Sequence, residues 1–415
     1  MRCCLSVSGL APRNHCYIDT ERRIPLPPNA SHNPPLSFPL PTVFKIVASR
    51  ASRLDVFGHL RRYRFGLFLV AVAIGCAEIS ARIDDWVRYR IPLTHTPDYE
   101  HDLKFRDWFG VRGRPSGQYY ELKLNNYGFR GEDVTRLPRA GCTRIMALGA
   151  SETVGISEAS GQEYPAQLRD TLRRHGCFEV LNSAIAGAGL KSLIRLWDFY
   201  SSDFSPRSVI IYPSPSFYLA DEESRWSPVA SAPPKDLPVT PQPRLLQRVY
   251  SSWHTPDIVQ RYRLRRWIAA DSIGKGADWV FRSPPTRRLD IFMTDLDSLV
   301  KSIRARGSEP VLVTHAMRFD SRVENGDEQW KLVWRRNEPR ATSETILAFE
   351  VLAAQRMRAY AAAENVRLVD AERVMSGRRE LFSDFVHFTR RGSATMAGLI
   401  SRELESPRPS GRDSP

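Results

Sequence analysis

The chain has 415 residues, a formal net charge of +14 and six cysteines, and 42% of its residues are hydrophobic. This composition is that of a globular protein, and it excludes a disordered, collagen-like or disulfide-dense chain. Repeated apolar runs of about 20 residues do not occur, which excludes a protein with many membrane spans. The positive charge comes from 52 Arg and 8 Lys, spread from Arg2 to Arg412. Because nucleic-acid sites gather their cations on one face, this spread indicates compositional bias on a solvated surface and predicts no nucleic-acid partner.

The first 60 residues are unfavourable for regular structure. Residues 24–41 contain seven prolines, which remove backbone donors and prevent a continuous helix. Cys3, Cys4 and Cys16 do not have the spacing of metal ligands. We therefore expect a disordered tail over 1–60, and translation from a mis-assigned start codon is the alternative. A second short disordered tail is expected over 405–415.

An uncharged apolar run from Phe65 to Ala77 follows several arginines. At ~1.5 Å per residue, this run is short for the ~30 Å of a bilayer core, so a membrane segment needs flanking residues and is expected over 61–82. The cations before the run and Asp84–Asp85 after it predict a cytoplasmic N-terminus. Everything downstream would then be extracytoplasmic, in the periplasm or on the cell surface, starting with a stalk and lead-in over 83–140.

Two other interpretations of the apolar run remain open. A cleaved signal peptide has an apolar region of this length behind basic residues, and Ile74-Gly75-Cys76 could then be a weak lipoprotein cleavage site. A buried core helix is the other.

From about 141 to 404 the pattern alternates between strands and helices, apart from an insertion over 219–290. The alternation predicts an α/β domain with a parallel sheet and helices on both faces, whose ligands bind at the carboxyl ends of the strands. The expected strands are 144–149, 178–182, 208–212, 310–314 and 367–370. The expected helices are 164–175, 190–200, 294–306 and 343–364, with a final amphipathic helix after residue 391.

Three segments at the expected carboxyl ends carry reactive residue types. Ser151 follows the first strand within Gly-Ala-Ser-Glu-Thr, on a tight turn that presents its hydroxyl and aims backbone N–H groups at a ligand. Gly187 lies in a small-residue turn after the second strand, where a glycine lets a ligand approach the backbone N–H. Asp384 and His387 follow the last strand, and their spacing lets Asp384 orient His387 as the base that deprotonates Ser151. Each segment alone is more typical of an ordinary turn or helix start.

In this order the segments resemble the SGNH (GDSL-type) hydrolase superfamily, over about 260 residues. Upstream, Asn126-Tyr127-Gly128-Phe129-Arg130-Gly131 is similar to the segment that precedes the catalytic serine in many membrane-anchored bacterial members. The resemblance implies a flavodoxin-like three-layer α/β/α sandwich and hydrolysis or transfer of an ester-linked acyl group. It also implies that Ser151 is the nucleophile and its N–H an oxyanion-hole donor together with that of Gly187. His387 would be the general base and Asp384 its orienting acid. Asn126 and Arg130 are candidates for contact with substrate.

The third block departs from the family pattern. Ser216 occupies the position of the asparagine that normally donates to the oxyanion. Loss of one such donor costs roughly 10²–10³ in rate, so the site could be slower, recruit another donor or be inactive. His315, after the fourth strand, is a candidate replacement, and a histidine that caps its loop is the alternative. Glu152 stands where the family commonly has aspartate.

The insertion over 219–290 contains Trp226, Trp253, Trp267 and Trp279 among many arginines. We expect it at the edge of the active site, either as a lid with its own small core or as an aromatic and basic wall for a carbohydrate or anionic polymer.

Cys142 and Cys177 precede the first two strands, which are neighbours in this fold. Both would lie at the amino-terminal edge of the sheet, close enough for a disulfide, which would suit an exported protein. Two free thiols are the alternative.

The sequence therefore predicts a membrane-anchored serine esterase that acts on O-acyl, chiefly O-acetyl, esters of a cell-envelope glycan, with a catalytic triad and an oxyanion hole. The alternatives are an O-acyltransferase that uses the same triad and a non-catalytic glycan-binding or assembly protein. No metal cluster, phosphate loop or dinucleotide fingerprint occurs, so no cofactor and no metal are predicted.

Overall fold

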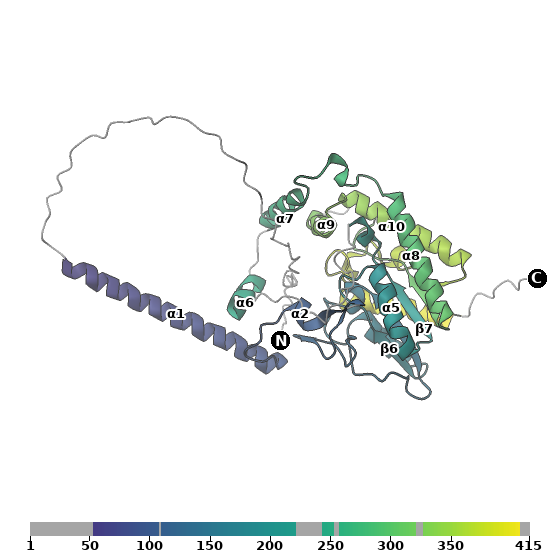
Figure 1. Ribbon diagram of the computed structural model, residues 1–415, viewed down its shortest axis with the longest axis horizontal. Helices are drawn as coiled ribbons and strands as arrows, with labels where there is room; N and C mark the ends of the chain where they lie inside the picture. Colours follow the sequence, from purple (N-terminus) through teal and green to yellow (C-terminus); the bar gives the residue numbers. More distant parts are fainter. Residues whose placement is uncertain (1–52, 108, 221–242, 253–256, 321–326, 407–415) are drawn as a thin grey trace, which may run out of the picture. The chain divides into compact units, whose positions relative to one another are not determined.

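The computed structural model describes residues 53–107, 109–220, 243–252, 257–320 and 327–406 (Figure 1). Residues 1–52 of the tail predicted over 1–60, residues 407–415 of the tail predicted over 405–415, and Trp226 and Trp253 lie outside the described residues. The described chain divides into two compact units. The larger contains residues from 97 onwards except 243–252, and the smaller contains 53–96 and 243–252.

The smaller unit consists of helix α1 (Arg53–Tyr89), helix α6 (Arg244–Ser252) and the segment that follows α1. Residues Tyr63–Tyr89 have a mean hydropathy of 1.8 over their most apolar window, and α1 is long and apolar enough there to cross a membrane. The helix begins at Arg53, so 53–60 are helical and do not belong to the tail that the sequence predicts. The last proline of the tail is Pro41, and none follows that could interrupt the helix before its end.

The larger unit contains a five-stranded parallel sheet. Its strands are β5 (Thr143–Gly149), β6 (Phe178–Asn182), β7 (Ser208–Tyr212), β8 (Glu309–Val313) and β9 (Arg367–Val369). Their order across the sheet is β6-β5-β7-β8-β9, and every neighbouring pair is parallel. This is the flavodoxin-like order 2-1-3-4-5 of doubly wound sheets. The predicted α/β fold class is confirmed, and the expected strand boundaries differ from the observed ones by no more than one residue.

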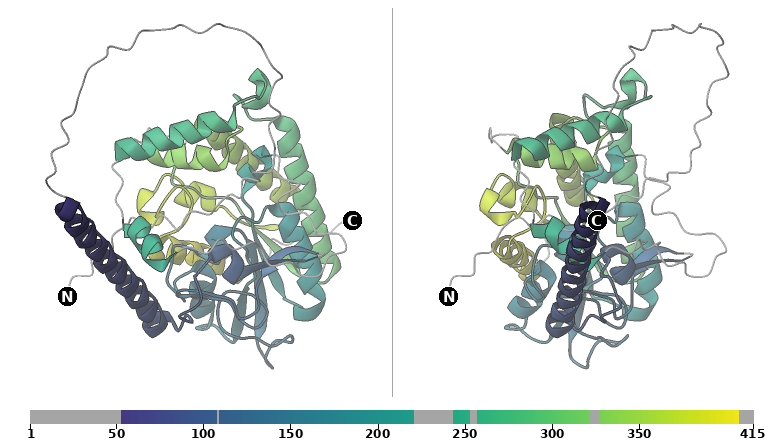
Figure 2. Two further views of the ribbon diagram at one scale, coloured as in Figure 1. Left: turned by 60° about the vertical axis from the view of Figure 1, so that its left-hand side comes forward. Right: turned by 90° about the vertical axis from the view of Figure 1, so that its left-hand side faces the viewer.

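Helices cover both faces of this sheet (Figures 1 and 2). Met146 and Leu148 of β5 pack with α5 (Leu190–Phe204), α8 (Thr286–Ala305) and α10 (Ser343–Ala363). Ile145 and Ala147 point to the other face, where they pack with α4 (Tyr164–Leu172), α11 (Ala371–Met375) and α12 (Arg390–Glu405). Alternate residues of one strand therefore serve two apolar cores, as expected for a strand buried on both sides.

The shorter elements surround the sheet and its lead-in. They are α2 (Tyr99–Leu103), β1 (Lys104–Asp107), β2 (Gly110–Gly113), β3 (Gln118–Tyr119), β4 (Leu122–Lys123), α3 (Ser151–Val154), η1 (Pro215–Leu219), α7 (Asp257–Asp271), η3 (Ala277–Trp279), α9 (Glu328–Asn337) and η4 (Arg379–Leu381). β1 pairs with β2 and β3 with β4, both antiparallel.

The described part of the insertion is divided between the two units, whereas the sequence predicts one segment at the edge of the active site, as a lid or as an aromatic and basic wall. Its helix α6 belongs to the unit of α1, whereas α7 lies alongside α9 in the larger unit (Figures 1 and 2). α8 begins at Thr286, directly after Pro285 and earlier than expected, because its buried stripe of Leu289, Phe292 and Leu296 already starts in the first turn. The guanidinium of Arg336 lies over the ring of Trp267, and that of Arg340 over Trp279.

A disulfide joins Cys142 to Cys177, with 4.5 Å between their Cα atoms. Thr143 N donates a hydrogen bond to Cys177 O at 2.8 Å directly beside it. The bridge therefore fastens the amino-terminal ends of β5 and β6, at the opposite edge of the sheet from Ser151.

Candidate active site

Ser151 is the first residue of α3 and follows the end of β5 after one turn residue. A side chain on Gly149 would collide with the Thr153 hydroxyl, so this tight strand-to-helix turn requires glycine. Ser151 is half-buried, and its Oγ donates a hydrogen bond to Oε2 of Glu152 at 3.2 Å. The fold thus presents the Ser151 hydroxyl at the carboxyl edge of the sheet, beside a carboxylate.

Asp384 and His387 form a hydrogen-bonded pair in the loop before α12. Nδ1 of His387 lies 2.6 Å from Oδ2 of Asp384, and Oδ1 of Asp384 accepts from the N–H groups of Val386 and His387 at 2.9 and 2.8 Å. Three donors therefore fix the carboxylate, and the carboxylate fixes the imidazole. Nε2 of His387 is buried and makes no hydrogen bond within the described residues.

The charges of this pair support each other. Burial raises the pKa of Asp384, but attraction to His387 and the three hydrogen bonds outweigh it and lower the pKa overall. Burial lowers the pKa of His387, but attraction and hydrogen bonding to Asp384 outweigh it and raise the pKa to about 9. Asp384 therefore favours the protonated form of His387, and His387 favours the ionised form of Asp384.

Aromatic packing connects the His387 loop to the serine turn. Phe388 stacks on Tyr212, the last residue of β7, with 6.2 Å between ring centroids. The Tyr164 ring packs edge-on against Tyr212, and its hydroxyl donates to Thr153 Oγ1 at 3.1 Å. Electrostatic attraction to His387 also contributes to the lowered pKa of Glu152. The structure thus brings the His387 loop to the edge of the sheet that bears Ser151, although the two side chains are not hydrogen-bonded to each other.

Gly187 lies in the turn after β6 with φ +80°, a left-handed conformation that favours glycine. Among the described residues nothing accepts a hydrogen bond from its N–H. The preceding carbonyl, Ala186 O, accepts from the buried ammonium of Lys104 at 2.9 Å. Because a trans peptide directs its C=O and N–H to opposite sides, Lys104 orients the Gly187 N–H away from itself.

A buried chain of charged groups lies beneath the serine turn. His315 directs Nε2 to Glu152 Oε1 at 3.2 Å and Nδ1 to Glu350 Oε2 at 3.0 Å. Glu350 Oε1 accepts from the backbone N–H of Ser216 at 2.9 Å, and Glu152 Oε1 accepts from Ser214 Oγ at 3.3 Å. The turn after β7 is therefore fastened at two points to the same chain of groups, and the Ser216 N–H is already used by Glu350.

The charge state of this chain follows from burial and pairing. Burial raises the pKa of Glu152, but hydrogen bonding and attraction to His315 outweigh it and lower the pKa to about 2. Burial lowers the pKa of His315, but the two glutamates outweigh it and raise the pKa to about 10. A protonated His315 can donate from both ring nitrogens, which matches its two carboxylate partners.

Arg130 fastens the loop that follows Ser151. Its buried guanidinium donates to the carbonyl oxygens of Val154 at 2.7 Å and of Glu158 at 2.8 Å, and also to that of Gly155. Asn126 is exposed and closes its own loop, because its side chain exchanges hydrogen bonds with the backbone of Val134. Both sequence candidates for substrate contact are thus engaged with the protein backbone.

Sequence reasoning did not identify Lys104 or Glu350. Glu350 had a detectable signal, because it is a lone acid on the buried stripe of α10 formed with Ile346, Ala353 and Met357. Lys104 had none, since its partner Ala186 is 82 residues away and the contact is to a backbone oxygen. Within the described residues no group of three or more His, Cys, Asp and Glu side chains could hold a metal ion.

Comparisons with known proteins give neighbours of known structure but no sequence relative. No protein-family description and no curated protein match the sequence. A GDSL-like lipase from Bacteroides thetaiotaomicron is 14% identical over 63% of this chain and 88% of its own, with a TM-score of 0.35. A catalytic mutant of an acetylxylan esterase from Geobacillus stearothermophilus is 14% identical over 64% and 95%, with a TM-score of 0.38. The acetylxylan esterase AlAXEase is 14% identical over 63% and 99%, with a TM-score of 0.34.

The strand order is independent of these comparisons. It follows the 2-1-3-4-5 pattern, with the serine turn, the glycine turn and the turn of Ser216 after three adjacent strands. The five-stranded parallel sheet with helices on both faces fits the fold of the SGNH hydrolases, the superfamily that the sequence motifs resemble.

Proposed function

We propose that the chain is a serine esterase that hydrolyses O-acyl esters. The observation that supports this most is the Asp384–His387 pair, with its 2.6 Å hydrogen bond and a buried Nε2 that has no partner among the described residues. A buried nitrogen without a hydrogen-bond partner lowers the stability of the folded protein, and a catalytic role is one reason why such a group is found in a native structure. The proposal requires that the Ser151 side chain, which is paired with Glu152 in the resting structure, rotates toward this nitrogen.

The reaction follows from these roles. Neutral His387 takes the proton of the Ser151 hydroxyl while Oγ forms a bond to the ester carbonyl carbon, and the carbonyl electrons move to the oxygen. The N–H groups of Ser151 and Gly187 donate to this oxyanion, with the Ser216 hydroxyl as the third donor. Collapse of the intermediate expels the alcohol, which takes the proton from His387. Water then releases the acyl group by the same steps.

The proposed substrate is a small acyl ester, above all an O-acetyl group on a cell-envelope glycan. The buried side chains around the serine turn, Glu152, Ser214, Ser216 and His315, are polar or charged, which suits a short acyl group better than a long apolar chain. The apolar helix α1 supports an enzyme held at the cell envelope, with the larger unit outside the cytoplasm.

Labelling with a fluorophosphonate tests the nucleophile, because the reagent forms a phosphonyl bond only to an activated serine and releases fluoride. We expect labelling of the wild type, none of Ser151→Ala, and full labelling of Ser160→Ala, whose exposed hydroxyl serves only Glu121 O. Labelling that persists in Ser151→Ala, or is absent from the wild type, would contradict the proposal and favour a non-catalytic glycan-binding protein.

Substrate assays then separate hydrolysis from transfer. We expect faster turnover of p-nitrophenyl acetate than of p-nitrophenyl decanoate, with free acetate as the product when an oligosaccharide is present. If the acetyl groups are recovered on the oligosaccharide and no free acetate forms, the result would favour an O-acyltransferase with the same triad.

A further inference from the structure

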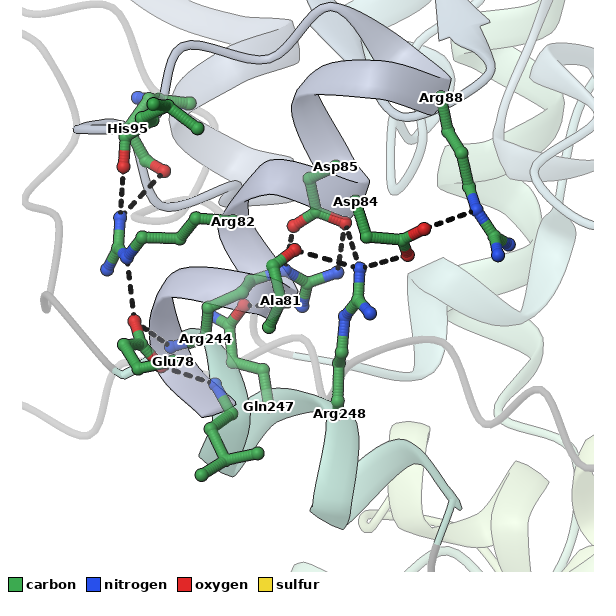
Figure 3. Close-up of polar contacts among 12 residues, drawn as sticks. Glu78, Ala81, Arg82, Asp84, Asp85, Arg88, His95, Arg244, Gln247 and Arg248 are labelled. Atoms are coloured by element: carbon green, nitrogen blue, oxygen red, sulfur yellow. Dashed lines mark hydrogen bonds and ion pairs between the residues drawn. The ribbon is translucent and has the colours of Figure 1, made fainter. Parts of the chain in front are cut away.

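Helices α1 and α6 are joined by a cluster of ion pairs (Figure 3). Arg244 donates to both carboxylate oxygens of Asp85, and Arg248 reaches Asp84 and Asp85, each at 2.7 Å. Glu78 accepts from the backbone N–H groups of Arg244 and Leu245, at 2.9 and 2.7 Å. The carboxylates of α1 are thus satisfied by the first turns of α6.

The residues that form these contacts lie on the faces where the two helices meet. On α1, Glu78, Ala81 and Asp85 recur at helical spacing toward α6, and Ala81 and Asp85 are buried. On α6, Arg244, Gln247 and Arg248 recur in the same way, and Arg244 donates to Gln247 at 3.0 Å. The interior of this helix pair is therefore polar and internally paired.

The outward faces are apolar. Ile79, Ile83, Trp86 and Val87 of α1 are 47–59% exposed, and they lie on the side of the helix away from the paired acids. Leu246 and Val249 of α6 are each 48% exposed, opposite Arg244 and Arg248. A helix pair in water buries its apolar faces and exposes its charges. This pair does the reverse, as expected for helices surrounded by lipid, where polar groups must find partners inside the protein.

The pairing of α1 with α6 also explains how an apolar run shorter than a bilayer core could belong to a membrane anchor. The apolar run Phe65–Ala77 spans only ~20 Å at ~1.5 Å per residue, and three acids follow it. With those acids paired to α6, the lipid-facing surface continues along Ile79, Ile83 and Val87 toward the end of α1. We propose that α6 is inserted into the interfacial layer of the lipid bilayer as the second helix of the membrane anchor, with Leu246 and Val249 toward lipid.

Site-specific fluorescence in the full-length chain tests this. Cys3, Cys4, Cys16 and Cys76 are replaced by serine, the disulfide is kept, and one cysteine is introduced as Leu246→Cys, Val249→Cys or Leu137→Cys. Each is labelled with an NBD fluorophore and reconstituted in vesicles of phosphatidylcholine and phosphatidylglycerol. Leu137 is the matched control, because it is an exposed leucine of the larger unit.

We expect nitroxide-bearing lipids to quench the label at 246 and 249, and iodide on both sides of the membrane to quench it at 137. Iodide quenching at 246 and 249 equal to that at 137 would overturn the proposal. The inference rests on α1 as an anchor, so flotation with the vesicles is measured on the same samples. A chain that does not float contradicts both claims, whereas one that floats with α6 exposed to iodide contradicts only the second.

A second variant tests the ion pairs. Asp85→Asn removes the carboxylate that both arginines share, so lipid quenching at 246 should fall while fluorophosphonate labelling of Ser151 in the larger unit is retained. Unchanged quenching at 246 would overturn the role of the ion pairs in holding α6 at the membrane.

Discussion

Glu152 and His315 are 163 residues apart in the chain, and Nε2 of His315 lies 3.2 Å from Oε1 of Glu152 beneath the serine turn. Glu152 also accepts a hydrogen bond from the Ser151 hydroxyl, while His315 is held from its other side by Glu350. The resting position of Ser151 therefore depends on a buried chain of charges that reaches from α3 to α10. Through the Ser216 N–H, the same chain also fixes the turn after β7.

Substitution of Glu350 by glutamine should destabilise the protein in a pH-dependent way. The raised pKa of His315 contributes stability that is fully present below its unfolded value near 6.5 and is lost as the pH rises through about 10. Because Glu350 is a main cause of that rise, we expect Glu350→Gln to cost about 1.5–3 kcal/mol at pH 6, the worth of a hydrogen bond to a charged group, and less at pH 9. Urea unfolding at the two pH values measures this.

Glu344 supplies the control for this experiment, since it lies exposed on the same helix α10. Glu344→Gln should change the free energy of unfolding by no more than about 0.5 kcal/mol at either pH. An equal loss of stability at pH 6 and pH 9 in Glu350→Gln would contradict a protonated His315.

Substitution of Lys104 by methionine should slow the reaction of Ser151 without changing its pH dependence. Lys104 holds Ala186 O at 2.9 Å and so orients the Gly187 N–H, a proposed oxyanion donor. Loss of one such donor costs about 10²–10³ in rate, and we expect a decrease of that order in the rate of fluorophosphonate labelling. Lys123→Met, at an exposed lysine of the same lead-in region, should label at the wild-type rate. A wild-type rate in Lys104→Met would show that the Ala186–Gly187 peptide keeps its orientation without the ammonium.

Substitution of Asp384 by asparagine should lower both the rate and the pH at which labelling appears. His387 acts as a base only when neutral, so wild-type labelling should rise with pH through about 9, its pKa. Asp384 causes that raised pKa, and without it burial favours the neutral imidazole, so the midpoint should move to lower pH. The maximal rate should fall by about 10⁴, because the imidazole is no longer held in the productive tautomer.

The measurement is the labelling rate between pH 6 and pH 10. Asp203, a half-buried residue whose carboxylate lies 3.7 Å from Arg136, gives a control variant, Asp203→Asn, for which we expect the wild-type profile. A profile of Asp384→Asn that falls in rate but keeps its midpoint would exclude Asp384 as the cause of the raised pKa.

The fold could be predicted from the sequence because its signals are local. β7 is a β-branched run bounded by prolines, and β6 coincides with its predicted range, Phe178–Asn182. The strand order across the sheet came from the resemblance of the motifs and not from these local patterns. The helix boundaries were less accurate, as the earlier start of α8 illustrates, because capping and packing decide them.

The site could be predicted only in part, for a related reason. Asp384 and His387 are three residues apart, so their contact could be predicted from the local sequence. Lys104 and Glu350 act over long separations, and no local pattern connects them to Ala186 or His315. The division of the insertion between two units could not be predicted either, because the ion pairs between α1 and α6 join residues more than 150 positions apart.

Removal of the disulfide should destabilise the α/β unit without changing the reactivity of Ser151. The bridge closes a loop of 35 residues between the amino-terminal ends of β5 and β6, and the lost restriction of the unfolded chain is worth about 4 kcal/mol in the chain-entropy model. We expect Cys142→Ala/Cys177→Ala to unfold at a lower urea concentration, while the folded protein still labels at Ser151, which lies at the opposite edge of the sheet. Cys76→Ser, at the free cysteine of α1, should leave the urea midpoint unchanged. A double variant with the wild-type midpoint would mean that the hydrogen bond from Thr143 N to Cys177 O and the pairing of the two strands already hold these ends together.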